Sequence, residues 1–180
     1  MRIVGGKYRG RVFTPGKTFK ARPTTDMAKE SLFNVLHNYI DFEGIKTLDL
    51  FSGTGSISYE FASRGSDNVT AVEINPAHIQ FIKEVIEKLG EKNIRIVKSN
   101  AFVFAKRIKE QFDLIFADPP YDHPQFAEVA DLIFKNNLLK PGGIFILEHS
   151  SQFDYAKHPN FKELRRYGSV HFSLFESSLP

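Results

Sequence analysis

A short polar motif follows an apolar run in the second half of the chain. Residues 112–117 are rich in Phe and Ile and too few for a free-standing helix, so they predict a buried strand. The next four residues are Asp118, Pro119, Pro120 and Tyr121. The two prolines cannot donate to a sheet, so the strand ends before them. A rigid tetrapeptide at the carboxyl end of a buried strand lies where open α/β sheets bind ligands.

This tetrapeptide suits methylation of a conjugated amine. The lone pair of an exocyclic amino group on a base is delocalised into the ring, so the nitrogen is a poor nucleophile. Asp118 can accept one N–H and the carbonyl of Pro119 the other, which would localise the lone pair toward a methyl donor. Tyr121 offers a face on which the base can stack. An ordinary strand-ending turn is the alternative explanation of the four residues.

Composition limits the class of protein. The chain has 180 residues, enough for one domain with a sizeable core and a small appendage. It contains no Cys, which excludes disulfides, thiolate metal sites and a Cys nucleophile. The six His show no metal-ligand spacing, so no metal is expected. No apolar stretch approaches a membrane span and no signal peptide is visible, so we expect a cytoplasmic protein without a membrane partner.

Charge is distributed unevenly along the chain. The formal net charge is +3, but residues 1–29 alone carry eight Lys or Arg and one acid. A basic N-terminal segment on a mildly acidic body indicates a polyanionic partner, and Tyr8 among basic residues suits RNA. A solvated basic tail is the alternative. The residues expected to contact RNA are Arg2, Lys7, Tyr8, Arg9, Arg11, Lys17, Lys20, Arg22, Thr24 and Thr25.

Residues 1–21 are predicted to form a small basic β-hairpin, distinct from a main domain over residues 22–180. Residues 2–4 and 11–13 are β-like and are joined by a Gly-rich segment. A helix with one apolar face follows. Its N-cap is expected at Thr24, Thr25 or Asp26.

Strands and helices alternate from residue 46 to residue 148. The predicted strands are 46–50, 68–72, 94–98, 112–117 and 144–147, and the predicted helices are 56–63, 76–89, 101–108 and 125–136. Residues 140–143 are predicted as a turn, and residues 162–167 and 170–176 as a closing hairpin. This order predicts a Rossmann-like α/β fold: a doubly wound, mostly parallel sheet closed by an antiparallel C-terminal hairpin.

A loop with two glycines follows the first strand of this series. Gly53 and Gly55 allow a tight turn and let a ligand approach the backbone closely. Glu73 lies 20 residues beyond Gly53, at the end of the next strand, where an acid can accept hydrogen bonds from both ribose hydroxyls. The combination predicts an adenosine cofactor.

S-Adenosylmethionine fits this loop better than a nicotinamide dinucleotide. The third glycine of the dinucleotide fingerprint would fall at Ser58. Asp49 would oppose a pyrophosphate but suits the ammonium group of methionine. The tetrapeptide has no role in hydride transfer. The residues expected to contact S-adenosylmethionine, or its product S-adenosylhomocysteine, are Asp49, Phe51, Ser52, Gly53, Thr54, Gly55, Glu73, Ile74, Asn100 and Ala101.

The chain resembles the family of bacterial 16S ribosomal RNA guanine-N2 methyltransferases over essentially its whole length. The segment 22–26 (RPTTD) is the most particular of the shared motifs; the others are 1–3 with 5–6, 9–11, 32–34, 48–55, 63–65, 118–121 and 142–143. The resemblance implies methyl transfer to the exocyclic N2 of a guanine in small-subunit ribosomal RNA. We expect a monomeric enzyme that meets its RNA within a small-subunit particle or assembly intermediate, and naked RNA is the alternative substrate.

Three positions depart from the family pattern. This chain has Ser58 where the family usually has Gly, Met27 where it has Arg, and Asn100 where it has Asp. Asn100 can still accept from the adenine amine through its amide oxygen. Three other functions stay open: methylation of adenine N6 or cytosine N4 in DNA, methylation of a protein glutamine amide, and a non-catalytic RNA module that binds an adenosine nucleotide.

Overall fold

The protein is built around one seven-stranded sheet. The computed structural model describes residues 1–16 and 25–178. The strand order is β3-β2-β1-β4-β5-β7-β6, in which β1 to β5 are parallel and β7 is antiparallel to both of its neighbours. The strands are β1 (Lys46–Leu50), β2 (Asn68–Glu73), β3 (Ile94–Lys98), β4 (Phe112–Ala117), β5 (Leu139–His149), β6 (Phe161–Tyr167) and β7 (Val170–Glu176). The Rossmann-like fold with an antiparallel C-terminal hairpin is confirmed.

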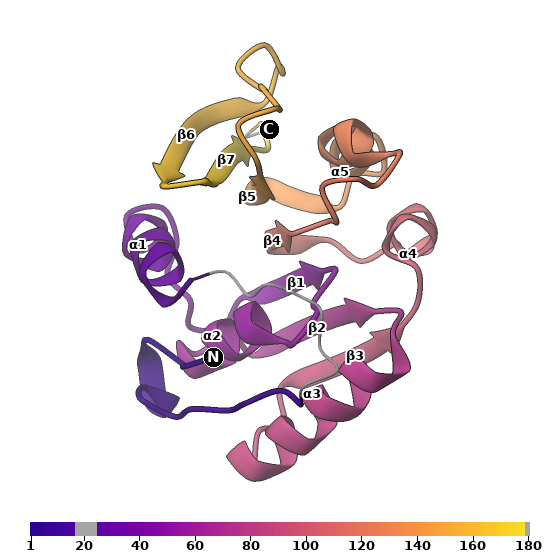
Figure 1. Ribbon diagram of the computed structural model, residues 1–180. Coiled ribbons are helices and arrows are strands. Elements are labelled where there is room, and N and C mark those ends of the chain that lie inside the picture. Colours follow the sequence, from indigo (N-terminus) through magenta and orange to yellow (C-terminus); the bar gives the residue numbers. More distant parts are fainter. Residues whose placement is uncertain (17–24, 179–180) are drawn as a thin grey trace.

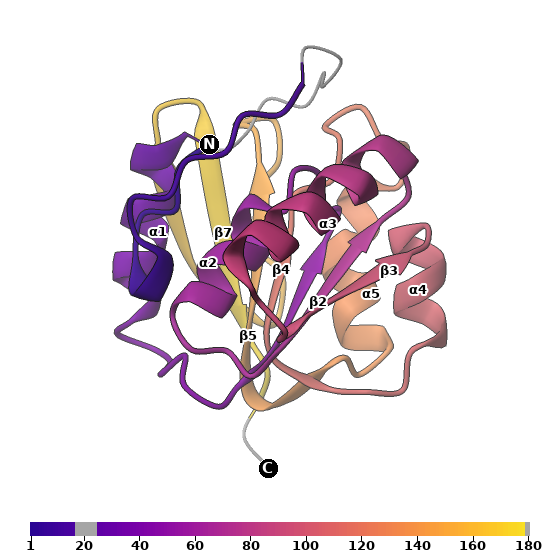
Figure 2. The ribbon, with the colours of Figure 1, turned by 90° about the horizontal axis from the view of Figure 1, so that it is seen from below.

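Helices cover both faces of the sheet (Figures 1 and 2). One face carries α1 (Asp26–Leu36), α2 (Ser56–Ser63) and α3 (Pro76–Leu89), and the other carries α4 (Ala101–Arg107) and α5 (Val129–Lys135). Helices α2 and α3 connect strands on one side of β1, whereas α4 and α5 lead to β4 and β5 on its other side. Because each crossover is right-handed, the two pairs of helices lie on opposite faces of the sheet. None of the helices within the described residues is long and apolar enough to cross a membrane.

Local sequence signals set the helix ends. The Thr25 hydroxyl accepts the N–H of Ala28 at 3.2 Å, so Thr25 is the N-cap of α1. The Asn75 side chain accepts the N–H of Ala77 at 2.9 Å, and a proline occupies the first position of α3. Gly90 ends α3 with a φ of +66°. Thr25 is one of the three residues that the sequence predicts as the N-cap of α1.

Strand β5 is longer than the predicted 144–147. Leu139 already pairs with Phe112, and pairing resumes where Ile144 meets Leu114. The predicted turn at 140–143 is therefore an interruption inside one strand. Gly142, with a φ of +72°, allows the chain to bend and then rejoin the sheet.

The predicted helix over 125–136 is divided. Its first turn is a 3₁₀ helix, η2 (Phe126–Glu128), and α5 begins only at Val129. The N–H groups of Phe126 and Glu128 donate to carbonyls three residues earlier, which is the 3₁₀ pattern.

The predicted N-terminal hairpin is reduced to one antiparallel bridge between Arg2 and Val12, with the 3₁₀ helix η1 (Gly6–Tyr8) between them. The N–H of Val4 donates to the Glu60 carboxylate at 2.7 Å, and that of Tyr8 donates to a hydroxyl of α2 at 2.9 Å. The N–H of Arg11 donates to the carbonyl of Tyr8 at 3.1 Å instead of across the pair, so the ladder does not continue. The segment lies against α2 in Figure 1.

Candidate active site

The two motifs predicted to do chemistry meet between β1 and β4. The chain leaves β1 toward one side of the sheet and β4 toward the other, so this is the topological switch point at which open sheets bind ligands. The loop 51–55 follows β1, and the motif 118–121 follows β4. The N–H of Asp118 donates to the carbonyl of Leu50 at 3.4 Å, which joins the two motifs.

The loop 51–55 has a conformation that depends on its glycines. Gly53 and Gly55 have φ values of +54° and +78°. A Cβ on Gly55 would lie 2.6 Å from the hydroxyl oxygen of Tyr59, which donates to the carbonyl of Thr54 at 2.8 Å. A Cβ on Gly53 would meet nothing closer than 3.9 Å. Gly55 is therefore needed for packing, whereas Gly53 leaves the backbone open to a ligand.

Two other residues of this loop have distinct roles. The Ser52 hydroxyl lies 2.9 Å from the carbonyl of Asp49 and 3.0 Å from that of Val72, so Ser52 ties the loop to β1 and β2. Phe51 has a positive φ of +62°, a strained conformation for a residue with a side chain. Its ring meets Phe102 edge-on at 5.6 Å between centroids. Strain of this kind is typical of functional loops.

Glu73 ends β2 and holds the loop after β1. Its Oε2 accepts the N–H of Gly53 at 2.8 Å, and its Oε1 accepts those of Ile74 at 2.9 Å and Asn75 at 2.8 Å. The Nδ1 of His78 lies 3.6 Å from Oε2. A carboxylate has about four acceptor positions. The predicted hydrogen bonds from two ribose hydroxyls therefore require a ligand to displace a backbone donor.

Asp49 lies in β1 directly beneath the loop and is almost fully buried. Its Oδ2 accepts the Ser58 N–H at 3.0 Å and the Ser58 hydroxyl at 2.6 Å. Burial raises the pKa of Asp49 to about 7; the two hydrogen bonds from Ser58 oppose this rise, and the charge of Glu73 adds to it. A cationic ligand group at this position would favour the ionised form of Asp49.

The predicted adenine contacts lie at the start of α4. Asn100 is the N-cap of this helix, and Ala101 is its buried first residue. The Asn100 Oδ1 accepts the N–H groups of Phe102 at 2.9 Å and Val103 at 3.2 Å. Acceptance from an adenine amine would make a third hydrogen bond to this oxygen, and it stays a prediction. Ile74, across the site, is 58% exposed.

Acidic side chains converge on Asp118. Burial, together with the charges of Glu148 and Asp49, raises the pKa of Asp118 well above its ordinary value. Glu148 lies in β5 beside Asp118, because Ala117 pairs with Leu147. No ion pair within residues 1–16 and 25–178 involves Asp49 or Asp118. This edge of the sheet is therefore complementary to a cation.

The rest of the tetrapeptide forms a tight turn. The carbonyl of Pro120 accepts the N–H of His123 at 2.9 Å. The carbonyl of Pro119 takes part in no hydrogen bond within the part of the chain that the structure describes. Tyr121 is 42% exposed, and its ring meets Phe126 edge-on at 5.9 Å. An acceptor carbonyl and an exposed ring thus follow Asp118, and their catalytic roles stay predictions.

Several residues expected to contact RNA also contact the body of the protein. Arg2 Nε lies 3.3 Å from Asp26 Oδ2. Lys7 Nζ lies 2.9 Å from Glu91 Oε2, and the Tyr8 hydroxyl donates to the same oxygen at 2.9 Å. The hydrogen bond from Lys7 to Glu91 raises the pKa of Lys7. These three side chains therefore hold the segment in place.

The remaining predicted RNA contacts differ in exposure. Arg11 donates to the carbonyl of Lys88 at 3.2 Å, and Arg9 is exposed. Thr25 is occupied as the cap of α1. Lys17, Lys20, Arg22 and Thr24 lie outside the described residues.

Three residues at this edge lie outside the predicted site. The charge of Glu148 raises the pKa of Asp118, and the only sequence signal of Glu148 is its place at the end of a strand. Phe102 stacks on His123 at 4.6 Å and touches Phe51, so it links the cofactor loop to the Asp118 turn. No spacing rule in the sequence predicts this row of rings. Within the described residues, no group of three or more His, Asp or Glu could hold a metal ion.

The sheet order, the glycine loop and the Asp118 motif together define a Rossmann-like methyltransferase. The chain belongs to the family described as conserved hypothetical protein 95, whose model matches residues 1–176. This confirms the resemblance drawn from the motifs.

Named relatives agree with this family. The chain is 31% identical to ribosomal RNA small subunit methyltransferase D of Buchnera aphidicola, over 97% of this chain and 91% of that protein. It is 32% identical to the Escherichia coli K12 protein of the same name, over 98% and 89%. A solved structure of a hypothetical protein from Thermus thermophilus covers 98% of this chain and 99% of that one, at 29% identity and a TM-score of 0.85.

Proposed function

We propose that this protein transfers a methyl group from S-adenosylmethionine to the exocyclic N2 of a guanine in small-subunit ribosomal RNA. The observation that carries the proposal is the acidic edge beside the glycine loop, where the charges of Asp49 and Glu148 act on Asp118. Buried carboxylates that raise one another's pKa favour a cationic ligand. S-Adenosylmethionine is cationic at its sulfur and its amine, whereas a dinucleotide pyrophosphate would be repelled.

The residues present fit this cofactor. Asp49 would face the ammonium group, the open backbone at Gly53 would accommodate close approach, and Glu73 would bind the ribose. The rings of Phe51 and Phe102 would border the adenine. When bound, S-adenosylmethionine supplies a methyl group that is already activated by the positive sulfur.

The chain's own residues would orient the base. Asp118 would accept one N–H of the exocyclic amine and the carbonyl of Pro119 the other, which turns the nitrogen lone pair toward the donor. The amine loses a proton after methylation. The raised pKa of Asp118 makes its carboxylate a better proton acceptor than an exposed aspartate. Tyr121 would stack on a base that has left its own stack.

The choice of RNA rests on the relatives, and the choice of guanine N2 rests on the family resemblance. Both relatives above are named small-subunit ribosomal RNA methyltransferases. The motif itself also suits adenine N6 or cytosine N4 in DNA and a glutamine amide. The monomeric state, the cytoplasmic location and the ribonucleoprotein form of the substrate stay predictions.

The test is incorporation of a tritiated methyl group from S-adenosylmethionine. The substrates are unmethylated small-subunit ribosomal RNA, small-subunit particles, duplex DNA and a glutamine-containing peptide, followed by nucleoside analysis of any labelled nucleic acid. We expect label in N2-methylguanosine from RNA or particles only. Label in N6-methyladenine, N4-methylcytosine or peptide would refute the substrate assignment. Cofactor binding without label in any substrate would favour the non-catalytic module.

A further inference from the structure

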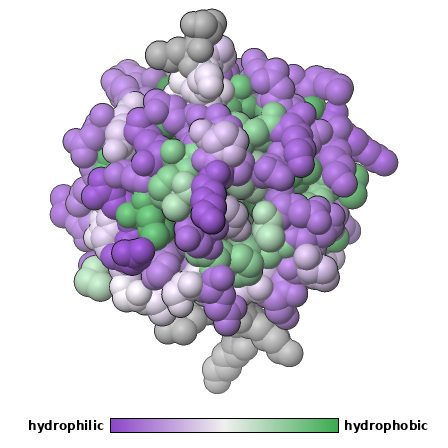
Figure 3. Space-filling model, turned by 90° about the horizontal axis from the view of Figure 1, so that it is seen from above, coloured by the Kyte–Doolittle hydropathy of each residue, from purple (hydrophilic) through white to green (hydrophobic). Residues whose placement is uncertain are grey.

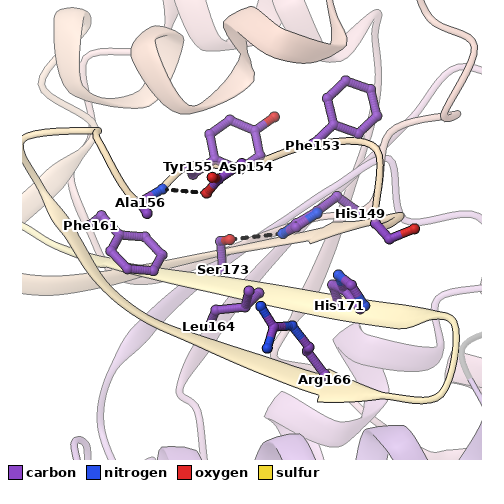
Figure 4. Close-up of a pocket in the computed structure, with 11 residues that line it drawn as sticks. His149, Phe153, Asp154, Tyr155, Ala156, Phe161, Leu164, Arg166, His171 and Ser173 are labelled. Carbon is purple, nitrogen blue, oxygen red and sulfur yellow. Dashed lines mark hydrogen bonds between the residues drawn. The ribbon is translucent and has the colours of Figure 1, made fainter.

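A cavity lies near the proposed active site. Its volume is about 480 Å³, within the usual size range of small-molecule sites. Strands β5, β6 and β7 and the loop after β5 line it (Figure 4). Strand β5 contributes His149, β6 contributes Arg166, β7 contributes His171 and Ser173, and the loop contributes Tyr155. Seen from the β6–β7 side, apolar surface gathers in the middle of a mostly hydrophilic face (Figure 3).

The inner wall of the cavity presents a fixed imidazole. His149 is buried, and its Nδ1 lies 2.8 Å from the carbonyl of Ser150, which can only accept. Nδ1 therefore carries the proton. Burial lowers the pKa of His149, so the ring stays neutral and its Nε2 accepts from the Ser173 hydroxyl at 2.8 Å. This wall is rigid and polar.

The ring of Tyr155 lines the cavity beside this imidazole. It meets the ring of His149 edge-on at 5.3 Å. The hydroxyl oxygen of Tyr155 is buried. A ligand in the cavity would therefore meet the ring of Tyr155 and not its hydroxyl.

The mouth of the cavity is cationic. Arg166 is exposed and pairs across the hairpin with His171. None of the ion pairs in the described part of the chain involves Arg166. Asp154, the carboxylate of the lining, accepts the N–H of Ala156 at 2.9 Å. A guanidinium beside ring-lined walls fits a phosphate joined to a base.

The cavity shares a wall with the proposed active site. Phe153 lines the cavity, and its ring stacks on that of Phe126 at 4.1 Å between centroids. The ring of Tyr121 meets the same Phe126 ring edge-on at 5.9 Å. A strand whose target base lies on Tyr121 would therefore carry an adjoining nucleotide toward this cavity.

We propose that this cavity binds a nucleotide of the substrate RNA next to the target base, with a phosphate on Arg166 and a base against the ring of Tyr155. This inference rests on the RNA substrate of the proposed function. A free nucleotide would present the same phosphate and base as a nucleotide of the RNA. The test therefore uses both RNA and a free nucleotide.

Titration of unmethylated small-subunit ribosomal RNA against three variants tests the proposal. Arg166→Ala should weaken RNA binding about 5- to 20-fold and reduce its salt slope by about one, because one phosphate contact is lost. Arg165→Ala is the matched control. It removes the same charge one position earlier in β6. The Arg165 side chain lies on the other face of the hairpin and pairs with Glu163 at 2.6 Å. We expect a change of less than about twofold there.

Tyr155→Leu removes the ring that the base is proposed to contact. It should weaken RNA binding about 5- to 20-fold, because a stacking surface is lost, and its melting temperature checks that the variant is folded. An enzyme that methylates RNA and binds it equally well without Arg166 and the Tyr155 ring would overturn this inference and leave the proposed function intact. Guanosine 5′-monophosphate that binds through Arg166 while RNA affinity is unchanged would assign the cavity to a free nucleotide and also overturn it. A wild-type protein that neither binds nor methylates RNA would overturn both.

Discussion

Replacement of Ser58 by Ala should shift the pH dependence of cofactor binding. The Ser58 hydroxyl is 2.6 Å from Asp49 Oδ2, and this hydrogen bond favours the ionised carboxyl. A hydrogen bond to a charged group contributes about 1.5–3 kcal/mol, which corresponds to about one to two pKa units. The pKa of Asp49 should therefore rise from about 7 to about 8–9 in the variant.

The effect on affinity follows from the ionised fraction. At pH 7 Asp49 is about half ionised in the wild type and about 1–10% ionised in Ser58→Ala. Only the carboxylate attracts the ammonium group, so S-adenosylhomocysteine should bind about 5- to 50-fold more weakly to the variant at pH 7. At pH 9 the difference should close to about twofold, because both proteins are then largely ionised.

Calorimetric titration with S-adenosylhomocysteine from pH 6 to pH 9 measures this shift. The charged and titratable groups near Asp49 are Glu73, Asp118 and Tyr59, and Ser58→Ala leaves all three in place. Ser63→Ala is the control: it removes another hydroxyl of α2, which donates to the carbonyl of Gly5 at 2.6 Å. An unchanged pH midpoint in Ser58→Ala, or an equal shift in Ser63→Ala, would refute the reasoning.

The pH dependence of folding stability gives an independent measure of the pKa of Asp49. The pKa of Asp49 is raised in the folded protein above its unfolded value. Its stabilising contribution is therefore complete below about pH 4 and is lost as the pH rises through about 7. In Ser58→Ala this loss should extend to higher pH. Urea unfolding at pH 5, 7 and 9 would show the change.

Three further predictions concern other parts of the molecule. Asp118→Asn should lower single-turnover methylation by about 10²–10³ while S-adenosylhomocysteine affinity stays within about twofold, as measured by rapid quench and calorimetry; near-normal turnover would show that the motif is only a turn. Lys29→Met should lower the free energy of unfolding by about 1–3 kcal/mol in urea unfolding, because the carbonyl of Arg2 and the hydroxyl of Ser56 lose a donor while the buried Glu60 keeps only Arg64 as a cationic partner; an unchanged free energy of unfolding would contradict this. If the N-terminal segment binds RNA, Arg9→Ala should reduce the salt slope of RNA binding by about one, whereas Lys7→Ala should mainly lower the melting temperature, because Lys7 is paired with Glu91; equal salt slopes in wild type and Arg9→Ala would contradict this.

The sequence predicts the parallel part of the fold well because its signals are local. Apolar strands that alternate with capped helices leave few topologies, and Asn75 and Gly90 mark both ends of α3. It predicts β5 less well. Pro141 and the glycines after it are typical of a turn, but pairing with β4 on both sides of 140–143 keeps the strand together. Pairing between distant segments overrides a local signal there.

The candidate site also has features that the sequence predicts and contacts that it does not. Spacing along the chain places Asp49, Gly53, Glu73 and Asp118 at one edge, because strands of a parallel sheet end together. Spacing could not show that Ser58 bonds to Asp49, since that contact depends on how α2 turns back over β1. Nor could charge alone show that Lys7 is paired with a distant acid.

The N-terminal segment is joined to the cofactor loop through a single buried ammonium group. Lys29 Nζ donates to the carbonyl of Arg2 at 2.6 Å and to the hydroxyl of Ser56 at 2.9 Å, and it lies 3.0 Å from Glu60 Oε1. Ser56 begins α2 directly after Gly55. An engineer who grafts this segment onto another methyltransferase, or swaps it between relatives, would have to transplant Lys29 and Glu60 with it. Without them, the grafted N-terminal segment would be loosely held. The loop 51–55 would also be disturbed, because Ser56 would lose its contact with Lys29.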